Sequence, residues 1–247
     1  MPALSHNARE TAKLGLRRFL YHFDLDLTRH PFVGQVARTA QAAGLNTVLD
    51  VGANVGQYAT LLRSGGFNGH IFSVEPLDDA YEILQKRAIK DGRWTVINAA
   101  VGAEPGTLTI HKASNSYSSS LLPITARHTD VAPDSVTIGE QEVEVRTVAE
   151  LIATYNVDPT RTLLKVDTQG YEMPVLDGAG SHLTDFAALQ LEMSFVELYA
   201  GQVLFDELHD KLRDLGFRIW AFEPGISDQD GRMLQCDTLF LGSASQK

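Results

Sequence analysis

Residues 46–62, NTVLDVGANVGQYATLL, together with IFSVEP at residues 71–76, decide the fold of this chain. The first stretch predicts a buried strand, a turn with one acid and two glycines, and a helix. The second predicts another strand that ends in an acid. A dinucleotide or nucleoside cofactor is bound by these parts in this order. Gly52 and Gly56 would let the backbone approach a ligand, and Glu75 would accept hydrogen bonds from both ribose hydroxyls.

The spacing within the turn indicates which cofactor is bound. A dinucleotide fingerprint reads G-x-G-x-x-G and rests the pyrophosphate on the helix N-terminus. Here Ala53 and Asn54 follow Gly52, so the spacing is G-x-x-x-G. The carboxylate of Asp50 would repel a pyrophosphate and attract the ammonium group of an amino-acid moiety. S-adenosylmethionine carries an ammonium and a sulfonium but no phosphate, so it is favoured. In the alternative, Asp50 and its glycine form only a tight turn that caps the helix.

Length, charge and cysteine content narrow the class of protein. A chain of 247 residues suits one large α/β domain, or a domain with an appendage. The formal net charge of −10 argues against nucleic acid as a partner. Cys236 is the single cysteine, which rules out an intrachain disulfide and a cysteine-only metal site. No apolar run approaches the length of a membrane span, and we expect a cytoplasmic protein.

The N-terminal part, residues 1–44, is expected to be helical. Residues 4–23 place apolar side chains at helical spacing and carry a basic face. This helix would pack on the core or, in the alternative, make a peripheral contact with an anionic membrane. A second helix is predicted over residues 32–43, with Gly44 as its stop.

Residues 45–247 are predicted to form the main domain, with alternating strands and helices and therefore a mostly parallel sheet. The expected strands lie near 46–51, 69–75, 94–100, 161–167 and 187–193. The expected helices lie near 56–64, 78–91, 147–155, 171–178 and 203–215. Two last strands, in 217–224 and 233–241, form an antiparallel hairpin at the sheet edge. Seven strands ending in a hairpin are typical of the Rossmann-like class I methyltransferase fold.

Residues 105–146 interrupt this alternation. Two predicted strands, GTLTIHKA and EVEVRTV, flank a long loop rich in Ser, Thr and Pro. A loop of this length inside a compact domain is usually a lid or a substrate-binding element, and we expect that role here. A passive surface insertion is the alternative.

Acids at the ends of the later strands are the candidates for chemistry. Asp167 ends a buried strand, Glu192 ends the next, and both should emerge beside the cofactor. They could orient a hydroxyl, hold a base or bind a divalent cation such as Mg²⁺. Glu172 stands in the first turn of a helix, where capping is the alternative to catalysis. His128 in the long loop, like His111 beside it, could act as a base, although a lone loop histidine is more often solvated.

The chain resembles the FkbM-type S-adenosylmethionine-dependent methyltransferases over roughly residues 46–241. The resemblance is carried by these motifs: DVGANVGQ (50–57), VEP (74–76), INAAVG (97–102), SSSLL (118–122), VRTVAEL (145–151), KVDTQGYEMPVLDGA (165–179) and LQLEMS (189–194). The spaced combination, above all K-x-D-x-x-G-x-E followed by a strand ending in Glu, is specific. A frequent family form has an acid where this chain has Gln169.

The resemblance implies the roles of the motif residues. Asp50 to Gly56 would line the methionine end of the cofactor, and Glu75 would hold its ribose. Asn98 and Ala99 would approach the adenine. The three residues implied to face the acceptor are Asp167, Glu172 and Glu192. Family members are chiefly O-methyltransferases of sugars, polyketides and glycolipids. The leader and length are similar to those of members that methylate deoxysugars of cell-surface glycolipids, so a small-molecule or glycolipid acceptor is expected.

Two other functions stay open at this point. One is a methyltransferase-like binding or scaffold protein without turnover. The other is an NAD-dependent oxidoreductase, which the turn spacing and the terminal hairpin disfavour.

Overall fold

The computed structural model describes residues 32–243, and these form a seven-stranded sheet with order β3-β2-β1-β7-β8-β10-β9. The strands are β1 (Thr47–Val51), β2 (His70–Val74), β3 (Trp94–Ile97), β7 (Thr162–Val166), β8 (Ala188–Ser194), β9 (Arg218–Pro224) and β10 (Gln235–Leu241). The pairs from β3 to β8 are parallel, whereas β10 is antiparallel to both of its neighbours. The predicted class I methyltransferase fold, with its antiparallel terminal hairpin, is confirmed.

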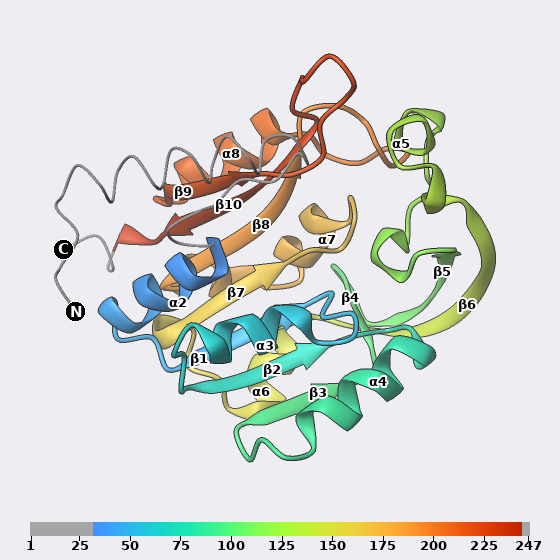
Figure 1. Cartoon of the computed structure of the whole chain (residues 1–247). Helices are drawn as coiled ribbons and strands as arrows, with labels where there is room; N and C mark the ends of the chain where they lie inside the picture. The colour runs from blue at the N-terminus through green and yellow to red at the C-terminus, as the bar shows by residue number, and fades with distance from the viewer. Residues whose placement is uncertain (1–31, 244–247) are drawn as a thin grey trace, which may run out of the picture. The chain divides into compact units, whose positions relative to one another are not determined.

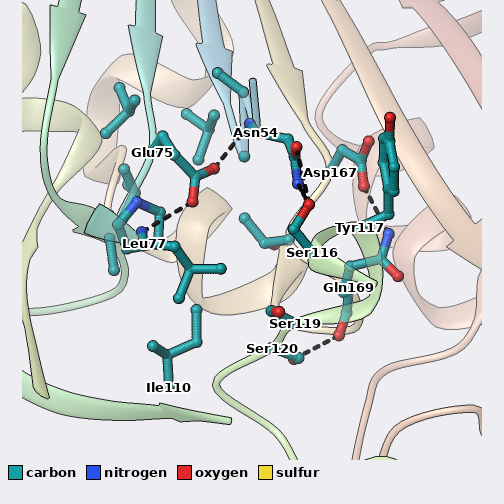
Figure 2. Close-up of a pocket in the computed structure, with 18 of the residues that line it drawn as sticks. Asn54, Glu75, Leu77, Ile110, Ser116, Tyr117, Ser119, Ser120, Asp167 and Gln169 are labelled. Atoms are coloured by element: carbon teal, nitrogen blue, oxygen red, sulfur yellow. Dashed lines mark hydrogen bonds between the residues drawn. The ribbon is translucent and has the colours of Figure 1, made fainter. Parts of the chain in front are cut away.

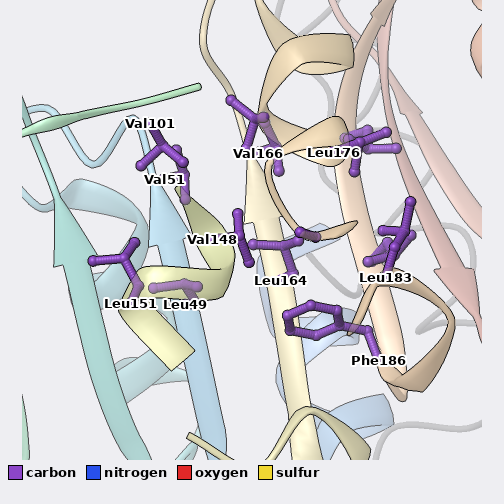
Figure 3. Packing of buried hydrophobic residues seen from close by; sticks show 14 of the residues in the cluster. Leu49, Val51, Val101, Val148, Leu151, Leu164, Val166, Leu176, Leu183 and Phe186 are labelled. Atoms are coloured by element: carbon purple, nitrogen blue, oxygen red, sulfur yellow. The ribbon is translucent and has the colours of Figure 1, made fainter. Parts of the chain in front are cut away.

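Helices cover both faces of this sheet, as Figure 1 shows. The helices are α2 (Phe32–Ala42), α3 (Gln57–Ser64), α4 (Asp78–Ala88), α6 (Val148–Tyr155), α7 (Glu172–Asp177) and α8 (Phe205–Asp214). α2 and α3 share one apolar cluster with Val48, Ile71 and Leu163 of the sheet. α6, α7 and α8 pack on the opposite face, where Leu49 and Leu164 lie at the centre of a larger cluster (Figure 3). Side chains alternate between these two clusters along each strand because the pleat has a period of two.

A row of polar side chains crosses the α3 face of the sheet near the carboxyl ends of its strands. Register pairs Ser73 with Asp50, Asp50 with Lys165, and Lys165 with Gln190. All four are buried. Buried polar groups are tolerated only when they are paired, so each member of this row needs a partner inside the protein.

The segment predicted as an insertion forms a second sheet together with β4, which precedes it in the chain; the order is β4-β6-β5, and the sheet lies beside the carboxyl ends of the first. Its elements are β4 (Ala100–Val101), β5 (Gly106–Ala113), η1 (Ser116–Ser118), α5 (Ala126–Val131), η2 (Pro133–Ser135) and β6 (Thr137–Arg146). The predicted loop is therefore ordered by short helices. The strand predicted over residues 94–100 ends at Ile97, because the chain then turns to pair β4 with β6.

Other boundaries agree with the sequence to within a few residues. α2 ends at Ala42, and Gly44 follows with a φ of 69°, as expected for a helix stop. The predicted helix over residues 4–23 lies outside the described residues. Among the described residues, no helix combines the length and the apolar character that crossing a bilayer requires.

Candidate active site

A well-formed pocket opens at the carboxyl ends of β1, β2 and β7 (Figure 2). The turn after β1 forms one side, and the loops after β2 and β3 form the second. The turn after β7 makes the third side, and the insertion covers the fourth. Open α/β sheets bind ligands at this edge, so the pocket is the candidate active site.

The turn after β1 is closely packed and internally bonded. Gly52 has a φ of 77°, and a Cβ there would lie 1.8 Å from the backbone oxygen of Asp167. The amides of Gly52 and Ala53 donate to Val74 O, both at 3.1 Å. The amide of Asn54 donates to Glu75 Oε2 at 2.8 Å, and the next two amides are bonded within the turn. The five backbone N–H groups from 52 to 56 therefore all have partners inside the protein.

Glu75 projects from the end of β2 into the pocket and is 4% exposed. Its two carboxylate oxygens accept from the backbone amides of Asn54 and Leu77, at 2.8 and 2.9 Å. Burial raises the pKa of Glu75 to about 7, although these hydrogen bonds act in the opposite direction. A carboxylate has about four acceptor sites, so two remain for the hydroxyls of a ligand.

Apolar side chains continue the wall beside Glu75. They are Val74, Leu77, Ala99, Val101, Ile110 and Leu121. A flat heterocycle such as adenine would bury its faces against such a wall.

The floor of the pocket is a buried ion pair network centred on Lys165. Its Nζ lies 3.3 Å from Asp50 Oδ1 and 3.2 Å from Asp167 Oδ2, and it donates to Gly52 O at 3.1 Å. Burial alone would lower the pKa of Lys165, but the two carboxylates outweigh it and raise the pKa. Lys165 is the one basic residue among the described residues that line the pocket, and its charge is already matched by two acids.

Asp167 is linked to Glu192 through a side-chain amide. Gln169 Nε2 donates to Asp167 Oδ1 at 2.8 Å and to Glu192 Oε2 at 2.5 Å. Asp167 lines the pocket, whereas Glu192 lies behind Gln169. Burial, followed by the charge of Asp167, raises the pKa of Glu192 well above its usual range.

The predicted divalent cation between Asp167 and Glu192 finds no support in this geometry, because the amide nitrogen of Gln169 fills the place between the two carboxylates. Over residues 32–243 no group of three or more His, Cys, Asp or Glu side chains is arranged to hold a metal ion.

The insertion closes the pocket with a serine-rich segment, residues 114–120. Ser116 Oγ is hydrogen-bonded to the side chain of Asn54, and Ser120 Oγ donates to Gln169 O at 2.7 Å (Figure 2). The segment is thus tied to both turns of the main sheet. Tyr117, 60% exposed, stands at the mouth of the pocket. The insertion is a wall of the site, as a lid or substrate-binding element would be.

The cofactor residues implied by the resemblance divide into two groups. Gly52, Ala53, Asn54, Glu75 and Ala99 line the pocket. The others, Asp50, Gly56 and Asn98, do not.

For each of these three, contacts inside the protein explain the difference. Asp50 is fully buried on the α3 face of β1, where it binds Lys165 and accepts from Ser73 Oγ at 3.0 Å. Gly56 makes room for Leu84 and Trp94, since its Cβ would lie within 3.0 Å of both side chains. Asn98 donates to the backbone oxygens of Glu75 and Pro76. In this structure the three residues therefore lie outside the lining of the pocket, in supporting positions.

Two predicted catalytic residues are also displaced from the pocket. Glu172 is 3% exposed, and its Oε1 accepts from the backbone amides of Thr168 and Gly170 at 3.0 and 3.1 Å. It therefore stabilises the turn and the start of α7, the alternative that the sequence left open. His128 is 1% exposed and packs edge-on against Tyr199, with ring centroids 4.9 Å apart. Burial lowers the pKa of His128, and its ring does not line the pocket.

Sequence reasoning missed Lys165, Tyr117 and the side chain of Gln169 as parts of the site. The K-x-D spacing was a usable signal for Lys165, because residues two apart on a strand share a face. No comparable signal exists for Tyr117, whose place depends on how the insertion folds. Gln169 was noted only as a departure from the family motif.

The groups that line the pocket suit S-adenosylmethionine in polarity and in charge. Glu75 and the apolar wall suit an adenosine, and acids outnumber cations at the floor. A ligand that carries a sulfonium and an ammonium gains from this excess, whereas a phosphate would be repelled.

Comparisons with known proteins agree with this description. The family model described as the methyltransferase FkbM domain matches residues 50–219. No curated protein sequence matches the chain.

Solved structures of methyltransferases are similar at low identity. The methyltransferase domain of bacterial CtHen1-C is 13% identical, with a TM-score of 0.44 over 85% of this chain and 97% of that one. An rRNA methylase from Streptococcus thermophilus is 9% identical, with a TM-score of 0.47 over 87% and 99%. A TehB-like SAM-dependent methyltransferase from Corynebacterium glutamicum is 13% identical, with a TM-score of 0.39 over 96% and 100%. We assign the fold from the strand order of the sheet and not from these structural similarities.

Proposed function

Because the chain belongs to the FkbM family of S-adenosylmethionine-dependent methyltransferases, we propose that it is an O-methyltransferase acting on a hydroxyl of a sugar or glycosylated natural product. A deoxysugar of a cell-surface glycolipid is the narrower form of the proposal. The observation that carries it is Asp167, a carboxylate that lines the pocket beside the place for the donor.

The identity of the donor is supported by the backbone N–H groups of the turn after β1, which already donate hydrogen bonds inside the protein. A pyrophosphate is usually held by free N–H groups at a helix N-terminus. Here the N–H groups from 52 to 56 are occupied, and the acids Asp50 and Asp167 lie behind the turn. This arrangement disfavours the NAD-dependent alternative and favours a cationic donor.

The acceptor half is supported by the hydroxyl-rich wall of the insertion. Ser116, Ser119, Ser120 and Tyr117 all line the pocket, and such groups can exchange hydrogen bonds with a polyhydroxylated acceptor. The exposed ring of Tyr117 offers an apolar face at the mouth, against which a sugar ring could pack.

The bound donor supplies an activated methyl group on a sulfonium. The acceptor oxygen forms a bond to the methyl carbon while the carbon–sulfur bond breaks and leaves its electron pair on sulfur. In this proposal Asp167 takes the hydroxyl proton, and its two oxygens are held by the ion pair with Lys165 and the hydrogen bond from Gln169. The protein thus contributes alignment and a proton acceptor.

A peripheral contact with an anionic membrane would suit a glycolipid acceptor. The basic stretch RETAKLGLRR, residues 9–18, supports this part of the proposal by its charge alone. It lies outside the described residues.

Calorimetry with S-adenosylhomocysteine tests the donor half. We expect micromolar binding to the wild-type protein and at least about tenfold weaker binding to Glu75→Ala, since a hydrogen bond to a charged group contributes about 1.5–3 kcal/mol. Asp167→Asn should bind within about threefold of wild type yet lose most of its turnover. Binding that is absent at millimolar ligand would contradict the proposal.

Labelled methyl transfer into a panel of glycolipids and free glycosides tests the acceptor half. Label in an ether linkage, lost in Asp167→Asn, is the expected result. Binding of the donor without transfer to any acceptor would instead favour the scaffold alternative, and protection of the fold by NADH alone would favour the oxidoreductase.

A further inference from the structure

Gln169 lies at the centre of a hydrogen-bonded group that joins the pocket floor to the insertion. It occupies the turn between β7 and α7 with a φ of 57°, and Gly170 follows with a φ of 96°. Ser120 binds its backbone oxygen from the insertion side, and Glu172 holds the two amides that flank it. A non-glycine residue in this conformation is uncommon, so the turn fixes the direction of its side chain.

The side-chain amide of Gln169 is satisfied at both ends. Its two N–H hydrogens go to Asp167 Oδ1 and Glu192 Oε2, at 2.8 and 2.5 Å. Its Oε1 accepts from the hydroxyl of Tyr199 at 2.6 Å. The opposite orientation of the amide would place Oε1 against two carboxylates and is therefore disfavoured.

The charges around Gln169 explain why a neutral donor matters there. The titratable groups that face it or its partners are Asp50 on β1, Lys165 and Asp167 at β7, Glu172 on α7, Glu192 on β8, Asp237 on β10 and Tyr199. Lys165 Nζ already donates to Gly52 O and is ion-paired with Asp50 and Asp167 at 3.3 and 3.2 Å. Among the described contacts, Glu192 is held by Gln169 and by no cation.

We propose that Gln169 is a positioning residue, which holds the carboxylates of Asp167 and Glu192 as a fixed pair so that Asp167 can take the proton of the acceptor. The neutral amide orients both acids without adding a charge beside them. The role in proton removal rests on the proposed function, whereas the holding of the pair does not.

The variant Gln169→Glu tests the proposal because it keeps the shape and replaces the amide donor by a third carboxyl. Like charges in one site raise the pKa of the group that must lose its proton. We expect the acid limb of the kcat/KM profile to move to higher pH by about one unit or more, with S-adenosylhomocysteine affinity within about threefold of wild type. Gln229→Glu, which adds the same charge on an exposed turn, should leave the profile unchanged.

A second measurement needs neither an acceptor nor turnover. The side-chain amide signals of Gln169 in a ¹⁵N–¹H NMR spectrum, assigned from triple-resonance spectra of the wild-type protein, should shift with pH as the acid pair titrates. Asp167→Asn should change the midpoint of that shift. This arm uses the wild-type protein, so it holds even if Gln169→Glu fails to fold.

Two results would overturn the proposal: amide signals that do not respond to pH between 5 and 9, or a folded Gln169→Glu whose acid limb stays in place. If no acceptor is methylated but the amide signals titrate, the proposed function fails and the pairing of Asp167 and Glu192 by Gln169 is upheld.

Discussion

Lys165 is the cation that matches the buried carboxylates of the pocket floor. Its ammonium is 4% exposed and faces the fully buried carboxylate of Asp50. A buried pair of this kind adds little net stability compared with an apolar pair, but the removal of one partner leaves a buried charge unmatched.

We therefore expect Lys165→Met to lower the free energy of unfolding by about 3–5 kcal/mol in urea denaturation. The double variant Lys165→Met, Asp50→Asn should recover part of this loss, because the unmatched charge is gone. Lys86→Met is the control, since its exposed pair with Glu82 should contribute less than about 1 kcal/mol. Equal losses in both lysine variants would contradict the explanation.

At the residue scale the sequence predicts which acids lie near the strand ends, but not which of them line the pocket. Asp50 and Glu75 both stand near strand ends, yet only Glu75 reaches the pocket. The two acids differ in their position on the strand. Asp50 lies within β1, one residue before its end, and its side chain points toward Lys165. This pairing exists because β1 lies beside β7. The alignment of two strands 115 residues apart is a tertiary property, which a motif does not contain.

At the scale of elements, the inner strands of the main sheet could be predicted because they are buried on both faces and appear as apolar runs; these are β1, β2, β7, β8 and β10. α5 could not, since Ala126–Val131 is too short to show a helical period. β9 lies at the edge of the sheet, while β10 lies between β8 and β9. The hairpin pattern predicts that the two strands pair but not which of them becomes the edge.

The turn after β1 packs closely against the end of β7 because Gly52 has no Cβ. A comparison with a second glycine separates this steric effect from the cost of a positive φ. Gly52 and Gly66 both have positive φ, so Ala at either position costs about 1–2 kcal/mol. A Cβ at Gly52 would also collide with Asp167 O, whereas one at Gly66 meets nothing within 4 Å. We expect Gly52→Ala to abolish binding of S-adenosylhomocysteine, and Gly66→Ala to retain it. A Gly52→Ala protein that binds normally in calorimetry would show that the two strands can move apart.

At the scale of the whole molecule, many buried acids make stability depend on pH. Burial raises the pKa of Glu75 and Glu172 to about 7, and that of Asp237 to about 6. Each group binds its proton more tightly in the native state than in the unfolded chain. The stability that they contribute is therefore present below about pH 4.5 and is lost as the pH rises toward 7. His70 and His128 oppose this below their usual pKa of 6.5, because burial lowers the pKa of both.

We expect the raised acids to dominate, since they are more numerous and the net charge of −10 adds repulsion at higher pH. The unfolding temperature of the ligand-free protein should fall by about 5 °C or more from pH 5.5 to 7.5. Glu172→Gln keeps the Oε1 acceptor and stays neutral, so its unfolding temperature should match wild type at pH 5 and exceed it at pH 8. The exposed Glu104→Gln controls for net charge. Calorimetric scans in which the wild-type protein gains stability over this range would show that the two histidines, and not the acids beside the pocket, set the pH response.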